Sequence, residues 1–280
     1  MKTIIVPIDF SDDSLDGLNM AMMLAKKTGA IIQMAHVIGK KIDNNELPEK
    51  KNQVAKRKFE EILQKCKDEG NINCALNYII KEGKIFSEVT DLADKFEDSI
   101  IVLSTHGESG FEELFIGGNA YKIASHSKNP VITVRKCKIS PHIDKIVLPI
   151  DITLQTREKV PYTVMLAKLF GSEIHLITIR GSHLRSIEKK LYKYTEQVCS
   201  YFWDHDIKYK VEHLQGGNLT DLILNYSASV NADLISIMTE QERSVSNLLL
   251  GTYAHQMINK ARIPVLSFPT YHLGNYAADF

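Results

Sequence analysis

Glycines and small polar residues cluster in one stretch of the first half of the chain. The segment Ser104–Gly107 reads STHG, and after nine residues the segment Gly117–Asn119 reads GGN. Glycines before a helix let backbone N–H groups approach an anion closely, so this spacing is suited to phosphate. The stretch fits neither the P-loop nor the dinucleotide fingerprint. The same glycines could also serve only a turn and a helix start, and this alternative stays open on the spacing alone.

Asp9 is a second residue with suitable chemistry. It follows the apolar run Thr3–Ile8, which has the β-branched character of a buried parallel strand. In parallel sheets, ligands bind beyond the carboxyl ends of the strands, at the point where the strand order reverses. Asp9 is therefore placed to accept hydrogen bonds from a sugar hydroxyl or a base amine. The strand expected at Ser99–Ser104 would end on the other side of the same point.

Catalytic and metal chemistry find less support. His106 stands beside Thr105, a pair that could suggest a base and a nucleophile. Adjacent side chains of an extended segment point to opposite faces, so the two would not meet as a catalytic pair. We expect His106 in a loop near phosphate and predict no catalytic residue. The histidines of the second half fall on different elements without HxxxH spacing, so no metal site is predicted from His175, His183, His205 and His213.

Alternating strand-like and helix-like segments must position these residues. In the first half, strands are expected at 3–8, 31–37, 75–80, 99–104 and 131–135, and helices at 12–28, 47–69, 85–96 and 119–126. Ser11 or Asp12 caps the first helix and Gly29 stops it. Strands that alternate with helices indicate a parallel sheet with right-handed crossovers. The predicted fold class is α/β, with a doubly wound, five-stranded parallel sheet.

The chain repeats this unit. Pro7 pairs with Pro149 and Asp9 with Asp151 at an offset of 142 residues, and Gly117 pairs with Gly251 at an offset of 134. Several anchors in one order at two offsets indicate a duplication. The sequence therefore predicts two tandem domains, at residues 1–137 and 143–270, followed by a tail at 271–280.

Composition excludes several classes of partner. The 280 residues include 34 Lys plus Arg and 34 Asp plus Glu, so the net charge is zero. A nucleic-acid-binding protein usually carries a basic footprint, and an anionic membrane also needs one, so neither partner is expected. The longest apolar runs fall short of the roughly 18 residues of a membrane span, and the four cysteines are scattered. We expect a cytoplasmic location.

These motifs resemble the universal stress protein family. The resemblance rests on Ile5–Ser11, on the segments Ser104–Gly107 and Gly117–Asn119, and on Asn129–Val134. Because both halves carry the pattern, the chain is similar to tandem two-domain members. The family fold is a five-stranded parallel sheet with helices on both faces, of the adenine nucleotide alpha hydrolase type. The resemblance implies a regulatory stress-response protein that binds ATP, with Mg²⁺ as an accompanying ion left open.

The family's ATP-binding members carry a glycine, two residues, a second glycine, nine residues, and a third glycine followed by Ser or Thr. Gly107 and Gly117 match the second and third glycines, whereas Ser104 replaces the first and Gly118 replaces the Ser or Thr. The resemblance assigns nucleoside contacts to Asp9 and to the backbone of Val37. The nucleotide-binding residues expected in the first domain are Pro7, Asp9, Val37, Ser104, His106, Gly107, Gly117, Gly118 and Asn119.

The second half departs from the motif. Met238–Gln241 replaces the first two glycines and brings Glu240, although Gly251 and Asp151 remain. We expect weak ATP binding or none there, and a structural or regulatory role. The family often pairs through its last strand, which implies an intramolecular pseudo-dimer through 131–135 and 265–268, and a homodimer as a further possibility. Two alternatives stay open: slow ATP hydrolysis, and a binding or scaffold module that takes an apolar or metabolite ligand.

Overall fold

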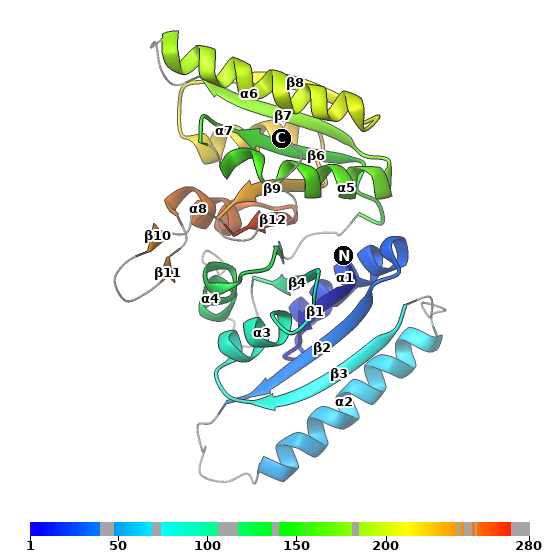
Figure 1. The fold of residues 1–280 in the computed structure, drawn as a ribbon. Coiled ribbons are helices and arrows are strands. Elements are labelled where there is room, and N and C mark those ends of the chain that lie inside the picture. Colours follow the sequence, from blue (N-terminus) through cyan, green and yellow to red (C-terminus); the bar gives the residue numbers. More distant parts are fainter. Residues whose placement is uncertain are drawn as a thin grey trace. The chain divides into compact units, whose positions relative to one another are not determined.

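The chain forms two compact units, residues 1–139 and 140–280, which we call the first and the second unit (Figure 1). The computed structural model describes residues 1–39, 48–68, 74–105, 117–135, 140–153, 155–180, 185–239, 242–243, 248–249 and 251–269. Each unit is described by itself. Both confirm the predicted α/β class, because each has a five-stranded parallel sheet with helices between its strands.

Strand β1 lies in the middle of the first unit's sheet, which has the order β3-β2-β1-β4-β5. The strands are β1 Thr3–Pro7, β2 Ile31–Ile38, β3 Leu76–Glu82, β4 Ser99–Ser104 and β5 Val131–Val134. All four neighbouring pairs are parallel, and Thr3 lies opposite both Ile31 and Ser99. The chain places β2 and β3 on one side of β1 and then crosses to the other side for β4. The strand order therefore reverses between β1 and β4.

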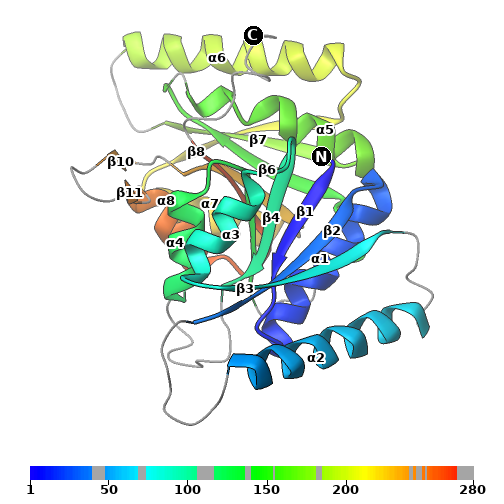
Figure 2. The ribbon, with the colours of Figure 1, turned by 60° about the horizontal axis from the view of Figure 1, so that its bottom comes forward.

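Four helices cover this sheet: α1 Asp12–Thr28, α2 Pro48–Asp68, α3 Ile85–Ala93 and α4 Gly118–His126. In Figures 1 and 2, α3 and α4 lie together on one face and α1 and α2 lie on the other. The predicted signals of α1 are confirmed. The Ser11 hydroxyl caps its amino end by accepting from the Ser14 N–H at 3.2 Å. Gly29 ends it with a left-handed φ of 71°.

Helix α3 ends three residues before the predicted end at Phe96. The N–H groups of Lys95 and Phe96 donate to the carbonyls of Leu92 and Ala93, each three residues back. This tighter pattern closes the helix in a turn, as is common at helix ends. The turn leads directly into β4.

The second unit repeats the arrangement, with the sheet order β12-β9-β6-β7-β8. Its strands are β6 Lys145–Ile150, β7 Glu173–Arg180, β8 Tyr209–Gln215, β9 Leu234–Met238 and β12 Val265–Phe268. Its helices are α5 Val160–Phe170, α6 Arg185–Asp204, α7 Leu219–Ser229 and α8 Thr252–Lys260. On α6, an apolar stripe at helical spacing is buried: Leu191, Tyr194, Val198 and Phe202.

The start of the first helix differs between the two units. Helix α5 begins later in its repeat than α1, because a short 3-10 turn at Gln155–Arg157 precedes it and Pro161 stands in its first turn. Proline fits that position because its missing N–H would have no partner there. An antiparallel pair of two-residue strands, β10 Glu242–Arg243 and β11 Leu248–Leu249, lies between β9 and α8 in the chain.

Within the described residues, no helix has the length and apolar character needed to cross a bilayer. The same residues contain no group of three or more His, Cys, Asp or Glu side chains arranged to hold a metal ion.

Candidate functional site

A cavity of about 360 Å³ opens in the first unit where β1, β2 and β4 end and α4 begins. This is the point where the strand order reverses, which is where ligands bind in sheets of this kind. The lining comes from the ends of three strands and from the first turns of α1, α3 and α4. The lining residues are Pro7, Ile8, Asp9, Ser14, Ala35, His36, Val37, Ile85, Leu103, Ser104, Thr105, Gly117, Gly118, Asn119, Ala120 and Ile123.

Seven of the nine residues expected from the sequence line this cavity. They are Pro7, Asp9, Val37, Ser104, Gly117, Gly118 and Asn119. The other two, His106 and Gly107, lie outside the described residues. The fold thus brings together residues that stand more than 100 positions apart in the sequence.

A tight turn holds Asp9 at the mouth of the cavity. Its Oδ1 accepts hydrogen bonds from the Ser11 N–H at 3.0 Å and from the Ser11 hydroxyl at 2.5 Å. Ser11 also caps α1, so the carboxylate is fixed to the start of that helix. A carboxylate has two oxygens that each accept more than one hydrogen bond, so the Asp9 side chain is of a type suited to a ligand donor.

Phe10 anchors this turn on the far side of the sheet. Its backbone is left-handed, with φ of 68°, which is rare for a bulky residue. Its ring lies 4.7 Å from the His36 ring and 5.0 Å from the ring of the fully buried Phe59 on α2, between ring centres. The His36 Nδ1 lies 2.7 Å from the Ile8 carbonyl oxygen. Since a carbonyl only accepts, Nδ1 carries the proton, and this bond ties the end of β1 to β2.

Gly117 closes the other side of the cavity by approaching the backbone of Thr105. The Gly117 N–H donates to the Thr105 carbonyl at 2.8 Å, and the Thr105 N–H donates to the Val134 carbonyl at 2.8 Å. A Cβ at position 117 would lie 3.0 Å from the Thr105 oxygen, so a larger residue there would require the Thr105 carbonyl to shift by a few tenths of an ångström. At Gly118, by contrast, a Cβ would meet nothing within 4 Å. The first N–H groups of α4, which have no partner within the helix, belong to this wall.

Part of the lining is apolar and continuous with the core. Leu103 and Ile123 belong to the buried cluster between the sheet and the α3–α4 layer, and the partly buried Val37 and Ile85 pack against it. The cavity therefore has a polar side formed by Asp9, Ser104 and Asn119 and an apolar side that suits a flat ring. Such a combination fits a ligand with one apolar part and one hydrogen-bonding part.

The sequence-based prediction missed several lining residues. Ser14 and Ile85 stand in the first turns of α1 and α3, and Ile123 stands in the second turn of α4. The sequence placed them inside expected helices and carried no signal that they line a ligand site. His36 could have been suspected from its place beside Val37 at the end of β2. The others become lining residues only through the packing of the helices on the sheet.

Comparisons with known proteins show the family of the chain. The model of the universal stress protein family matches the chain twice, at residues 1–135 and 142–269. The chain belongs to the universal stress protein family. It is 26% identical over 146 residues to a universal stress protein of Methanocaldococcus jannaschii, an alignment that covers 49% of this chain and 84% of that protein.

Solved structures share the two-unit fold. A universal stress protein from Archaeoglobus fulgidus superposes with a TM-score of 0.76 at 18% identity, covering 95% of this chain and 96% of its own. A putative universal stress protein from Pseudomonas aeruginosa gives a TM-score of 0.67 at 14% identity, covering 96% and 93%. At these identities the likeness shows the fold alone. With the double family match, it confirms the tandem arrangement of universal stress protein domains.

The second universal stress protein domain keeps part of the same geometry. The Asp151 Oδ1 accepts from the Thr153 N–H at 2.7 Å and from its hydroxyl at 2.6 Å, as Asp9 does from Ser11. The Gly251 N–H donates to the Thr239 carbonyl at 3.1 Å, as Gly117 does to Thr105. Both turns therefore survive the divergence of the two copies. Glu240 and Gln241 lie outside the described residues.

One substitution changes the interior of this second domain. Lys159 takes the position of Gly17, whose added Cβ would lie 3.4 Å from the Ser104 nitrogen. The Lys159 side chain is buried, with 2% exposure, and its Nζ donates to the Thr156 carbonyl at 2.9 Å. The Thr156 hydroxyl in turn accepts from the Asp151 N–H at 3.1 Å. In the second domain a buried lysine thus supports the Asp151 turn, at a position where the first domain has a glycine packed against β4.

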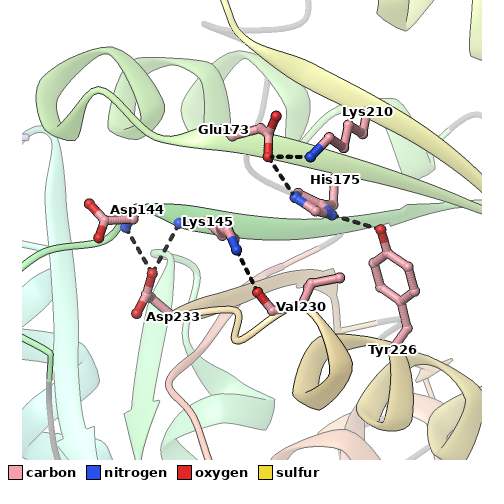
Figure 3. A network of polar contacts seen from close by, with 8 residues as sticks. All are labelled: Asp144, Lys145, Glu173, His175, Lys210, Tyr226, Val230 and Asp233. Carbon is pink, nitrogen blue, oxygen red and sulfur yellow. Dashed lines mark hydrogen bonds and ion pairs between the residues drawn. The ribbon is translucent and has the colours of Figure 1, made fainter.

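A separate polar network lies at the amino ends of the strands of the second domain (Figure 3). The buried His175 donates through Nε2 to the Glu173 carboxylate at 3.0 Å, and its Nδ1 lies 2.7 Å from the Tyr226 hydroxyl on α7. The exposed Lys210 donates to the same Glu173 oxygen at 3.2 Å. Burial raises the pKa of Glu173, but the hydrogen bonds from Lys210 and His175 outweigh it and leave that pKa lowered. This network joins β7, β8 and α7.

Proposed function

We propose that the first domain binds an adenine nucleotide in the cavity at the ends of β1, β2 and β4, with ATP as the ligand that the family resemblance implies. The observation that carries the proposal is the convergence of Asp9, the Gly117–Asn119 turn and an apolar wall on one cavity. Binding would serve a regulatory role in a stress response, in which the bound nucleotide biases the conformation or the choice of partner.

Each part of the cavity suits one part of a nucleotide. The Asp9 carboxylate can accept hydrogen bonds from ribose hydroxyls, and the apolar surface of Val37, Ile85 and Ile123 suits the base. The amino end of α4, at Gly118 and Asn119, offers N–H groups and a side-chain amide to a phosphate. A Mg²⁺ ion would enter with the phosphates rather than as a resident ion.

Calorimetric titration with AMP and with ATP tests this proposal. Wild-type protein should release or absorb heat with either nucleotide at up to millimolar concentration, and Gly117→Val should abolish the signal by displacing the Thr105 carbonyl. The matched control is Gly251→Val, which changes the corresponding glycine of the second domain. Its titration should equal that of wild type.

Several results would contradict the proposed binding site. No heat from wild type with either nucleotide would remove the proposal. Equal loss of binding in Gly117→Val and Gly251→Val, or loss only in the second, would place the site elsewhere. Circular dichroism of each variant shows whether it is folded before its titration is interpreted.

A further inference from the structure

Two aromatic side chains are exposed on α6, which lies against β7 on one face of the second domain's sheet (Figure 1). Trp203 is 77% exposed and Tyr192 is 65% exposed. Trp203 follows Tyr192 by three helical turns, so both rings lie on the same side of the helix, about 16 Å apart along its axis. The corresponding helix of the first domain differs, because the only aromatic residue of α2 is the fully buried Phe59. Exposed Trp and Tyr side chains are typical of protein–protein contacts.

The two halves of α6 carry opposite charge. The first ten residues include four basic side chains and one acidic one, whereas the last ten include two acidic side chains and neither lysine nor arginine. Because the amino end of a helix dipole is positive and its carboxyl end negative, this order of charges does not stabilise the helix itself. The order instead suits a partner whose charges run the opposite way.

Four exposed charged residues are placed symmetrically about the centre of α6. Arg185 is its first residue and Asp204 its last, and Lys193 and Glu196 flank its centre. A hydrogen bond with the Glu196 carboxylate raises the pKa of Tyr192, so the exposed carboxylate and the exposed ring are joined on the surface of the helix. Charged and aromatic groups thus share the outer side of α6.

A second copy of α6 in antiparallel orientation complements this arrangement. When two copies cross at their centres, Arg185 of one lies level with Asp204 of the other, and Lys193 of one lies level with Glu196 of the other. Two-fold symmetry makes each pairing twice. Trp203 then lies next to the level of Arg185 of the second copy, and guanidinium groups stack on aromatic faces. Lys189 lies level with Ser200, so it meets no like charge at its own level.

We propose that α6 is a surface through which this chain pairs with a second copy of itself, in an antiparallel helix contact. The inference is independent of the proposed function. A helix of 20 residues is about 30 Å long, and one contact of that length buries less than the roughly 800 Å² per partner of a standard interface. The dimer is therefore weak, forms at micromolar or higher concentration, and loosens as salt screens its ion pairs.

Two measurements on the intact chain test this proposal together. Sedimentation equilibrium should show the mass rising toward that of a dimer as the concentration rises from micromolar to near millimolar, and high salt should weaken the association severalfold. Trp203 is the only tryptophan of the chain, so its fluorescence reports on this surface alone. Its emission maximum should move to shorter wavelength over the same concentration range, because the indole leaves water.

Three results would overturn the inference. The first is a chain that stays monomeric over this range. The second is a dimer whose tryptophan emission does not change, because that chain pairs through another surface. The third is a monomer whose emission shifts only when phosphatidylglycerol vesicles are added, which would assign the surface to a membrane.

Charge reversal at the centre of α6 tests the antiparallel arrangement. Lys193→Glu alone or Glu196→Lys alone places like charges at the same level and should weaken the dimer at least tenfold. The double variant restores both pairs with their signs exchanged and should recover most of the affinity. The control is Lys56→Glu on the exposed side of α2, which should dimerise as wild type does. A double variant as weak as the single ones, or an equal loss in the control, would contradict the arrangement.

Discussion

At the scale of single residues, Phe10 holds the most unusual conformation in the candidate site. A left-handed backbone with φ of 68° destabilises the folded state by about 1 kcal/mol or more for a residue with a side chain. The packing of the Phe10 ring against His36 and Phe59 offsets this strain. The turn that carries Asp9 is therefore set by contacts on the other face of the sheet. An aromatic residue in place of glycine gives this turn both a strained backbone and a rigid anchor.

Two substitutions at this position should reverse the usual order of stability. Both Phe10→Ala and Phe10→Gly lose the ring contacts, but only the alanine variant keeps the strain of the left-handed backbone. We expect Phe10→Gly to be more stable than Phe10→Ala by about 1 kcal/mol in urea unfolding. At an ordinary position alanine is the more stable by about 0.5–1 kcal/mol, and that result here would contradict the assigned strain.

The adjacent glycines of α4 should respond in opposite ways. Gly117→Ala forces the Thr105 carbonyl to move and should cost about 1–3 kcal/mol, with weaker nucleotide binding. Gly118→Ala meets nothing within 4 Å and should stabilise the helix start by about 0.4–1 kcal/mol. Thermal unfolding of both variants beside wild type measures this contrast. Equal changes in stability for the two variants would contradict a destabilising contact between a Cβ at position 117 and the Thr105 carbonyl.

At the scale of elements, the network of Glu173, His175 and Tyr226 joins β7 to α7. His175 is buried, and each of its ring nitrogens has a partner, Glu173 for Nε2 and Tyr226 for Nδ1. The network stands at the strand ends opposite those that carry Asp151. It therefore serves the packing of α7 on the sheet rather than a ligand.

Its contribution should depend on pH. Because the pKa of Glu173 is lowered in the folded protein, its carboxylate adds stability above the unfolded value near 4.5, and this stability is lost as the pH falls through the lower folded value. Glu173→Gln should cost about 1 kcal/mol at pH 7. In urea unfolding, the gap to wild type should close near pH 3. A gap that persists at pH 3 would assign the effect to packing instead.

The sequence predicted the elements where local signals agree with packing. Ser11 and Gly29 bound α1 as expected, and the β-branched run before Asp9 became the central strand β1. The ribbon of β10 and β11 was not predicted, because two-residue strands have no periodicity. In the candidate site, Asp9 and Gly117 were predictable from their places at strand and helix ends. Ser14 and Ile123 were not, because their part in the cavity depends on how helices pack across the sheet.

At the scale of the whole molecule, the two domains share a turn geometry and differ in the groups around it. The Asp9 and Asp151 turns and the Gly117 and Gly251 approaches are the same in kind. Lys159 stands at the position that corresponds to Gly17, and its side chain is buried. Duplication followed by such changes in one copy accounts for the differences between the two domains.

Hydrogen exchange of the intact chain, with and without millimolar AMP, tests the central claim most directly. The account predicts slower exchange of backbone amides in the first domain, at residues 8–14 and 117–123 around the cavity. It predicts no change at the corresponding residues 150–156 and 251–257 of the second domain, which serve as the internal control. Equal protection of both domains, protection confined to the second, or no protection in either would contradict it.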